Sequence, residues 1–118
     1  MEQFRFLKWK MYTDAKLLFR DVLGVVKRIP KEYRFELGSQ LTRSSFSIML
    51  NMAEGSGKDS AKELNRFLDI SLGSLHETLA VLDIFRDCDF ISAKEFSSLS
   101  ERLHEIARQI GGFKKSIH

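Results

Sequence analysis

Residues 51–60, "NMAEGSGKDS", contain residue types that could do chemistry, because the pair Gly57-Lys58 could belong to a loop that wraps a phosphate group. Such a loop needs a glycine five positions before the pair and a hydroxyl directly after the lysine. Met52 and Asp59 occupy those positions, and no strand leads into the stretch. We therefore predict a turn between two helices, with Gly55 or Gly57 ending the first of them.

A second stretch, Glu101-Arg-Leu-His104, has the Glu-x-x-His spacing of metal sites in helical bundles. A di-iron site needs two such pairs, and neither of the other histidines has a glutamate three positions earlier. The His-Glu pairs at positions 76 and 104 lack the second histidine of a zinc protease. Cys88 has no activating neighbour in sequence and is predicted to be a partly buried structural thiol. The sequence therefore predicts no catalytic site, no cofactor and no metal, so the protein is not expected to be an enzyme.

Apolar residues recur at three- and four-residue spacings, the period of amphipathic helices, over four segments. These segments cover residues 12–29, 35–54, 61–86 and 96–117. Ser60 and Ser92 each stand three residues before a glutamate, the spacing of a capping box that begins a helix. Small residues at positions 71, 73 and 74 predict close packing of a neighbouring helix on the third segment. We therefore predict an all-α, up-down antiparallel four-helix bundle in which residues 1–118 form a single domain.

The charge of the chain is concentrated at its N-terminal end. The 118 residues carry 19 lysines and arginines against 16 aspartates and glutamates, and residues 1–34 hold nine basic and four acidic side chains. Clustered positive charge is typical of a polyanion site, although solvated basic faces are also common on helical proteins. The residues predicted to bind nucleic acid are Arg5, Lys8, Lys10, Lys16, Arg20, Lys27 and Arg28. Trp9 and Tyr12 either stack on unpaired bases or cover the end of the bundle.

The single cysteine excludes a disulfide framework and fits a reducing compartment. Charges interrupt the N-terminus where a signal peptide needs an apolar core, and no apolar run is long enough to span a membrane. We expect a cytoplasmic protein without a membrane partner.

Several short motifs follow one another along the chain: Gln40-Leu-Thr-Arg43, Ser47-Ile48, Asn51-Met-Ala-Glu-Gly55, Phe67-Leu68 and Gly73-Ser-Leu-His-Glu77. Together they resemble the pattern of the four-helix-bundle proteins encoded in intervening sequences of bacterial 23S ribosomal RNA genes. Met52 departs from the usual isoleucine. The resemblance implies a bundle that assembles as a ring-like homo-oligomer, commonly a pentamer, and that associates with RNA. A more distant likeness is to the accessory variability determinant of diversity-generating retroelements, a basic ring that binds nucleic acid.

The positions that match the family motifs are Arg43, Asn51, Glu54, Gly55, Gly73, Ser74 and Glu77. We expect Gly55 to supply the turn and Gly73 and Ser74 to supply a close helix contact. Arg43, Asn51, Glu54 and Glu77 are expected to form a polar cluster near the turn or an interface. A buried ion pair is favoured for Glu77.

Three functional hypotheses follow from the sequence. The first is a non-enzymatic homo-oligomer that displays the basic first helix and the C-terminal Arg108, Lys114 and Lys115 toward RNA. The second is a protein-interaction scaffold whose charge serves solubility. The third is an enzyme acting on nucleic acid, for which the sequence offers no acid-base pair and no set of metal ligands.

Overall fold

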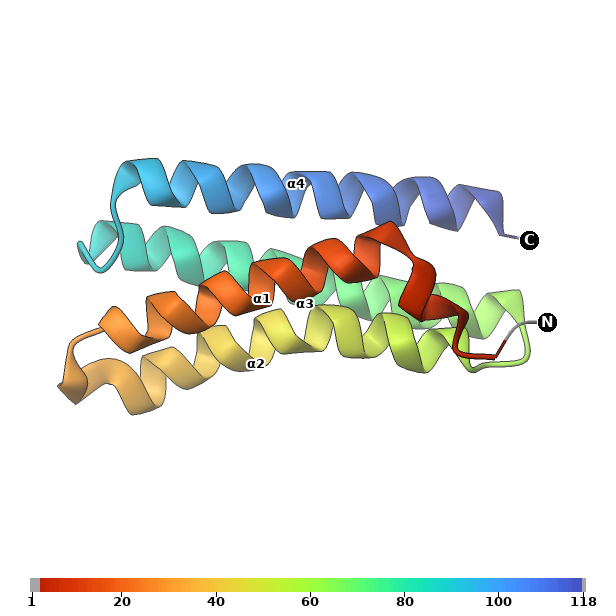
Figure 1. Cartoon of the computed structure of the whole chain (residues 1–118), viewed down its shortest axis with the longest axis horizontal. Helices are drawn as coiled ribbons and strands as arrows, with labels where there is room; N and C mark the ends of the chain where they lie inside the picture. The colour runs from red at the N-terminus through yellow and green to blue at the C-terminus, as the bar shows by residue number, and fades with distance from the viewer. Residues whose placement is uncertain (1–2, 118) are drawn as a thin grey trace.

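The structure is a computed structural model that describes residues 3–117. Four long helices lie side by side in an elongated bundle of 46 × 23 × 20 Å (Figure 1). They are α1 (Lys10–Arg28), α2 (Lys31–Ser56), α3 (Ala61–Asp87) and α4 (Ala93–Ser116), preceded by a short 3-10 helix, η1 (Arg5–Lys8). Successive helices run in opposite directions (Figure 1). The prediction of an all-α, up-down antiparallel four-helix bundle is confirmed.

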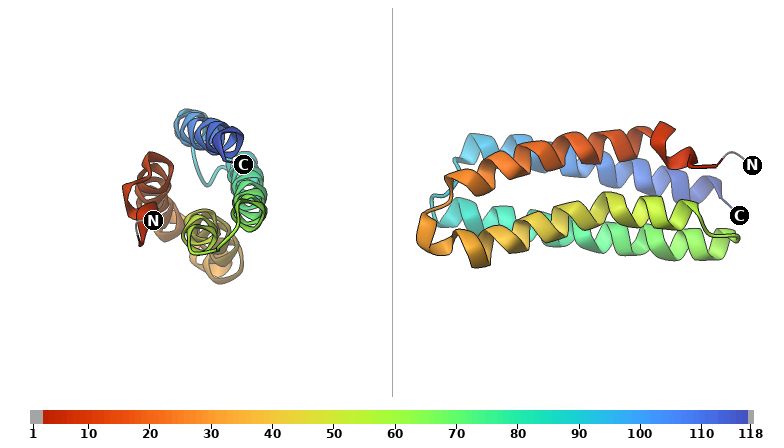
Figure 2. Two further views of the ribbon diagram at one scale, coloured as in Figure 1. Left: turned by 90° about the vertical axis from the view of Figure 1, so that its right-hand side faces the viewer. Right: turned by 60° about the horizontal axis from the view of Figure 1, so that its bottom comes forward.

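The helices are arranged around one apolar core. In the end-on view of Figure 2 they follow one another around the bundle in chain order, so that α4 returns to the side of α1. The most extensive contact joins α2 to α3, and the least extensive contact between long helices joins α1 to α4. Fully buried side chains at the centre include Leu18, Val22, Leu41, Ile48, Met52, Leu68, Leu82, Leu103, Ile106 and Ile110. Each such side chain contributes roughly 1.5–3 kcal/mol by leaving water.

The second helix begins earlier than its apolar pattern predicts. It starts at Lys31, directly after Pro30, instead of near Phe35. Proline lacks an N–H and has a fixed φ, so it suits the position just before a helix, where no N–H partner is needed. The carbonyl of Pro30 accepts a hydrogen bond from the N–H of Tyr33 at 2.9 Å. As a result, residues 31–34 are helical and their side chains project from the first turn of α2.

Both predicted serine caps are present. The N–H of Glu63 donates to Ser60 Oγ at 3.1 Å, and the N–H of Glu95 donates to Ser92 Oγ at 3.0 Å. Each serine thereby satisfies one of the N–H groups that a helix start leaves without a partner. The glutamate side chains do not complete the reciprocal half of the capping box as expected. Glu63 accepts hydrogen bonds from Arg66 within α3, and Glu95 accepts them from Arg28 of α1.

Small residues bring α2 and α3 together along a polar seam. Thr78 Oγ1 donates to Ser44 Oγ at 2.9 Å, and both side chains are buried. Ser71 Oγ donates to the main-chain carbonyl of Ile48 at 2.6 Å. Ser74 Oγ donates to Ser47 Oγ at 2.8 Å. Because these hydroxyls find partners across the interface or on their own helix, their burial is compensated, and short side chains allow a close approach.

Gly55 has a different role from the predicted one. It does not form the turn, because α2 continues through it to Ser56 and Gly57 occupies the C-cap with φ −89°. Instead Gly55 is buried against α3: a Cβ built on it would lie 2.7 Å from Phe67 Cβ and 3.2 Å from Leu64 Cδ1. The glycine is required because the backbone of α2 passes too close to α3 for any side chain.

Three further predictions about single residues are wrong. Gly73 is exposed, and a Cβ built there would meet no atom within 4 Å, so it does not mediate the helix contact that Ser71 and Ser74 make. Glu77 is exposed, and it forms no ion pair with any of residues 3–117. Cys88 is an exposed free thiol at the turn after α3, instead of a partly buried one.

Replacing the two glycines by alanine tests this packing. Gly55→Ala is expected to lower the free energy of unfolding by about 1–3 kcal/mol, because the added methyl group overpacks the α2–α3 contact. The matched control is Gly73→Ala, which is expected to raise the free energy of unfolding by about 0.5–1 kcal/mol through helix propensity alone. Urea unfolding of both variants at one protein concentration provides the comparison. Equal effects of the two substitutions would contradict the close approach at Gly55.

Candidate nucleic-acid interface

Three of the predicted basic residues share the outer face of α1. Lys16, Arg20 and Lys27 are exposed, and their spacings of four and seven residues place them on one side of the helix. The ammonium nitrogen of Lys16 lies 4.9 Å from the centre of the Tyr12 ring. Within residues 3–117 none of the three forms an ion pair. Their charge is therefore directed into solvent, as a phosphate contact requires.

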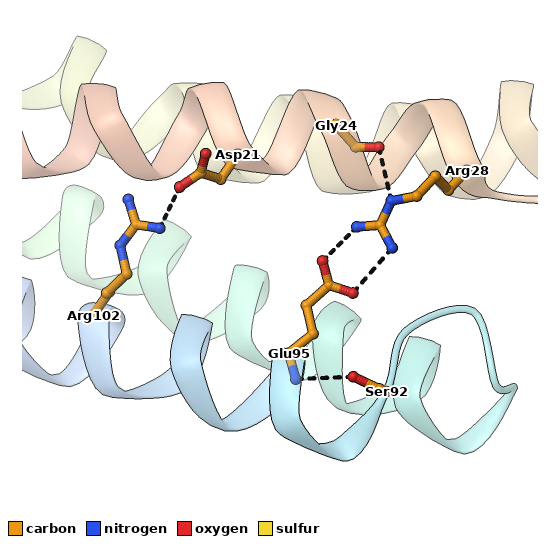
Figure 3. A network of polar contacts seen from close by, with 6 residues as sticks. All are labelled: Asp21, Gly24, Arg28, Ser92, Glu95 and Arg102. Carbon is orange, nitrogen blue, oxygen red and sulfur yellow. Dashed lines mark hydrogen bonds and ion pairs between the residues drawn. The ribbon is translucent and has the colours of Figure 1, made fainter.

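Arg28 points in a different direction, toward α4. Its guanidinium group donates to both carboxylate oxygens of Glu95, from Nη1 at 3.1 Å and from Nη2, while Nε donates to the carbonyl of Gly24 (Figure 3). These hydrogen bonds with Glu95 raise the pKa of Arg28. A second pair, Arg102 with Asp21, joins the same two helices (Figure 3). The charge of Arg28 is thus paired with Glu95 and helps to hold α1 against α4, so Arg28 is not one of the unpaired cations of α1.

Lys10 is also neutralised within the bundle. Its ammonium nitrogen lies 2.7 Å from Asp14 Oδ2, and Gln109 Nε2 of α4 donates to the same oxygen. Burial raises the pKa of Asp14, but the hydrogen bonds from Lys10 and Gln109 outweigh burial and hold that pKa below its ordinary value. Asp14 is therefore ionised at neutral pH and offsets the charge of Lys10.

The aromatic residues near the N-terminus cover the end of the bundle. Trp9 is half-buried, with its ring centre 4.7 Å from that of Phe113 of α4. Tyr12 meets Phe6 edge-on at 5.0 Å. Arg5 lies over Trp9, with its guanidinium carbon 5.7 Å from the ring centre, and Lys8 is exposed on η1. Of the two interpretations that the sequence left open for these rings, the structure favours the apolar cover.

The C-terminal end adds less positive charge than expected. Lys114 pairs with Asp69 of α3, and Arg108 pairs with Glu105 one turn earlier on α4. The hydrogen bonds from Arg108 lower the pKa of Glu105, which keeps that pair ionised. Lys115 is exposed. Two of the three basic side chains near the C-terminus, Arg108 and Lys114, are therefore paired with carboxylates.

Three basic residues of α2 complete the cationic surface. Sequence reasoning named Arg43 only as a motif residue and did not assign Lys31 or Arg34 to any site. Lys31, Arg34 and Arg43 line a hollow of about 510 Å³ between α1 and α2, which we call the Phe35 hollow. Its other lining residues include Val26, Phe35 and Thr42. Because α2 starts at Lys31, positions 31, 34, 38 and 42 lie along one face of the helix, and positions 35, 39 and 43 form the adjacent row. The spacing of Lys31 and Arg34 after Pro30 is the signal that could have revealed those two residues.

A second hollow lies in the same groove between α1 and α2. It has a volume of about 290 Å³ and is called here the Phe46 hollow. Its lining residues include Tyr12, Lys16, Phe19, Arg20, Phe46 and Leu50. Among residues 3–117, no acidic residue lines either hollow. We refer to the two hollows together as the α1–α2 groove, which combines five cations with apolar rings.

Gly38 explains why the floor of the groove is closed. A Cβ built on Gly38 would lie 2.9 Å from Val26 Cγ1, so the missing side chain allows α1 and α2 to touch. The cations of the groove stand above this contact. The groove is therefore a surface feature with an apolar floor and a basic rim, and each exposed cation could neutralise one phosphate group.

The polar residues of the family motifs do not come together in one cluster. Asn51 donates from Nδ2 to the carbonyl and to Oγ of Ser47, which keeps its amide within α2. Glu54 and Glu77 are exposed on different helices. Arg43 and Glu54 stand eleven residues apart on α2, about 16 Å along the helix axis. Of the motif residues, Arg43 is the one that contributes to the α1–α2 groove.

Two properties of the described residues bear on other kinds of site. Among residues 3–117, no three or more His, Cys, Asp and Glu side chains gather closely enough to hold a metal ion. His104 is exposed, with Nδ1 2.8 Å from the carbonyl of Ser100. The helices formed by these residues include none with the length and apolar character that crossing a membrane requires.

A solved structure of another protein has a similar fold. A crystal structure of a protein of unknown function from the S23 ribosomal protein family of Bacteroides thetaiotaomicron superposes with a TM-score of 0.82. The two chains share 20% sequence identity over 90% of this chain and 96% of the other. This similarity supports the four-helix bundle. No match to the sequence was found among curated proteins.

The sequence also matches a protein family over most of its length. The model of the family described as 23S rRNA-intervening sequence protein matches residues 8–112. The matched range includes all of α1, α2 and α3 and therefore both hollows of the α1–α2 groove. With its motifs, its bundle and this match in agreement, the chain belongs to the 23S rRNA-intervening sequence protein family.

Proposed function

We propose that this protein is a non-enzymatic, cytoplasmic RNA-binding bundle that acts as a ring-like homo-oligomer and binds RNA through the α1–α2 groove. The observation that carries the proposal is the composition of the groove: five cations and several rings, without an acidic residue in either hollow. Phosphates are neutralised by such cations with release of counterions, and rings add contacts to bases. The exposed, unpaired Cys88 is compatible with a reducing compartment.

The family descriptions support the choice of RNA as the polyanion. The family takes its description from a 23S rRNA intervening sequence, and the solved relative is attributed to a ribosomal protein family. Heparin-like and phospholipid surfaces would also attract a basic groove. RNA suits the mixture of cations and aromatic rings better than either, because its bases offer flat faces for stacking.

Self-association is supported by apolar side chains on the outer side of α3. Ile70 is 41% exposed and Ile84 is 56% exposed, with Gly73, Glu77 and Ala80 exposed between them. Large apolar side chains exposed on one face of a helix support a protein contact there. Assembly into a ring, with the pentamer that the family resemblance implies, would repeat the groove on each subunit. Several grooves, each with a weak affinity for RNA, would then bind one RNA together with a higher overall affinity through avidity.

A protein-interaction scaffold is the second candidate function. The Phe46 hollow favours it, because Phe46 and Leu50 are each more than two-fifths exposed beside the half-buried Phe19 ring. A partner helix with apolar and acidic side chains would fit this half of the groove. RNA binding remains the first proposal, because it uses the cations of both hollows.

Removing cations from the groove tests the RNA proposal. In the triple variant Lys16→Ala, Arg20→Ala, Arg43→Ala, the slope of log affinity against log salt concentration is expected to fall by about 2–3, with weaker binding. Anisotropy of a labelled structured ribosomal RNA fragment over a salt series measures both quantities.

The matched control removes three cations from elsewhere on the surface. Lys62, Lys94 and Lys115 are exposed on α3 and α4, so Lys62→Ala, Lys94→Ala, Lys115→Ala changes the net charge by the same amount. We expect this variant to bind nearly as the wild type does. Equal losses in the two triple variants would contradict the groove, and no binding by the wild type at low salt would contradict the proposed function.

The molar mass in solution tests the assembly. Light scattering at micromolar concentration is expected to give a multiple of the 13.7 kDa chain mass, with five copies as the expected number. Apolar contacts are not screened by salt, so the mass is expected to persist in high salt. A mass of 13.7 kDa would contradict the homo-oligomer.

A further inference from the structure

Phe35 has an unusual position for an aromatic side chain. It is 84% exposed, more than any other large apolar residue among residues 3–117. Other rings of the bundle are in contact with one another, as in the pairs Phe19–Phe46 and Tyr33–Phe90. In the described part of the chain, no ring is stacked on Phe35 and no cation lies over it. The bundle therefore gives this ring no packing role.

The surroundings of Phe35 are suited to a negatively charged ligand. Lys31, Arg34 and Arg43 line the same hollow, and no acidic residue does so. Arg34 donates from Nη2 to the carbonyl of Ile29 at 3.1 Å and from Nε at 3.3 Å. This double contact holds the guanidinium group in place without neutralising its charge. An anion in the hollow would contact the guanidinium group of Arg34, which is held in place. It would also contact Lys31 and Arg43, whose side chains can adjust their positions.

The hollow also contains hydrogen-bond acceptors. Thr42 Oγ1 donates its proton to the carbonyl of Gly38 at 2.9 Å, and Ser39 Oγ donates to the carbonyl of Phe35. Because each hydroxyl has committed its proton to the backbone, its oxygen retains lone pairs that can accept. Amino and imino groups on the edge of a nucleobase are donors of the matching kind. The volume of about 510 Å³ lies within the range of pockets that bind small ligands.

We propose that Phe35 is a stacking platform for an unpaired base, and that the groove therefore takes single-stranded RNA or the loop of a folded RNA. This inference rests on the proposed function and specifies its ligand. The base lies on the Phe35 ring with its edge toward Ser39 and Thr42, and the neighbouring phosphates contact Lys31 and Arg43. A base inside a duplex is already stacked on both faces and cannot lie on a protein ring in this way.

A protein segment is the less suitable occupant. An apolar side chain could cover Phe35, but Lys31, Arg34 and Arg43 would then lose water beside it, and the same segment would have to bring separate acidic side chains to supply their counter-charge. Uncompensated desolvation of charged groups is costly. A nucleotide supplies the flat ring and the anion together, which matches the two features of the hollow.

The test compares four variants on two RNA probes. The probes are a fluorescein-labelled single-stranded oligouridylate and a labelled blunt RNA duplex. Phe35→Ala is expected to weaken binding of the single strand by about 5- to 100-fold, the effect of losing one stacked base. Binding of the duplex and the salt slope are expected to stay unchanged, because no phosphate contact is removed.

Two substitutions separate stacking from simple apolar contact, and a third serves as the control. Phe35→Trp keeps a ring and is expected to retain affinity, with its added indole fluorescence quenched by the single strand above the background from Trp9. Phe35→Leu keeps apolar area without a ring and is expected to lose as much affinity as Phe35→Ala. The control Leu17→Ala removes an exposed apolar side chain of α1 that lines neither hollow of the groove, and it is expected to leave RNA binding intact.

Several results would overturn the proposal. If the wild type binds RNA with a steep salt dependence and Phe35→Ala binds equally well, the stacking site is wrong while the proposed function stands. If Phe35→Leu retains affinity, apolar area is enough and stacking of a base on the ring is wrong. If Phe35→Ala changes the molar mass in solution without changing RNA affinity, the ring serves a protein contact. If the wild type binds neither probe, the proposed function itself fails.

Discussion

The close approach of α2 and α3 is the constraint on which the rest of the bundle depends. Gly55 leaves no space for a side chain against Phe67, and Ser44, Ser71 and Thr78 bridge the two helices with compensated hydroxyls. One face of α2 is thereby committed to α3, and α1 must pack on the other. Gly38 then lets α1 touch α2, while ion pairs such as Arg28 with Glu95 close α4 onto α1 (Figure 3).

This order of packing determines where charge is displayed. Arg28, on the α4 side of α1, pairs with a carboxylate and becomes part of the scaffold, whereas Lys16 and Arg20 line the groove toward α2, where no acidic residue among residues 3–117 lines the hollows. The α1–α2 groove is therefore basic because its two helices contribute Lys16, Arg20, Lys31, Arg34 and Arg43 without a facing acid. Like charges held together on a fixed surface repel one another, and a polyanion relieves that repulsion.

The sequence predicts the four helices and their caps well, because apolar periodicity and Ser-x-x-Glu spacing are local signals. It does not predict which basic residues are free, since the partners of Arg28 and Lys114 lie on other helices. The two glycine assignments fail for a related reason. Gly55 and Gly73 both lie in apolar helical segments of the sequence. They differ in the distance from a Cβ built on each glycine to the neighbouring helix, which is very short for Gly55 and beyond contact for Gly73. The apolar pattern does not reveal that Lys31 and Arg34 belong to α2, because its apolar positions begin near residue 35 while the helix begins directly after Pro30.

The most direct test of RNA binding through the α1–α2 groove is ultraviolet crosslinking of the wild-type protein to a uridine-rich RNA, followed by mass spectrometry of the crosslinked peptides. Crosslinks concentrated in the peptides that carry Phe35, Arg43 and Arg20 are the predicted result. Crosslinks concentrated on α3 and α4, with the groove peptides unmodified, would contradict it.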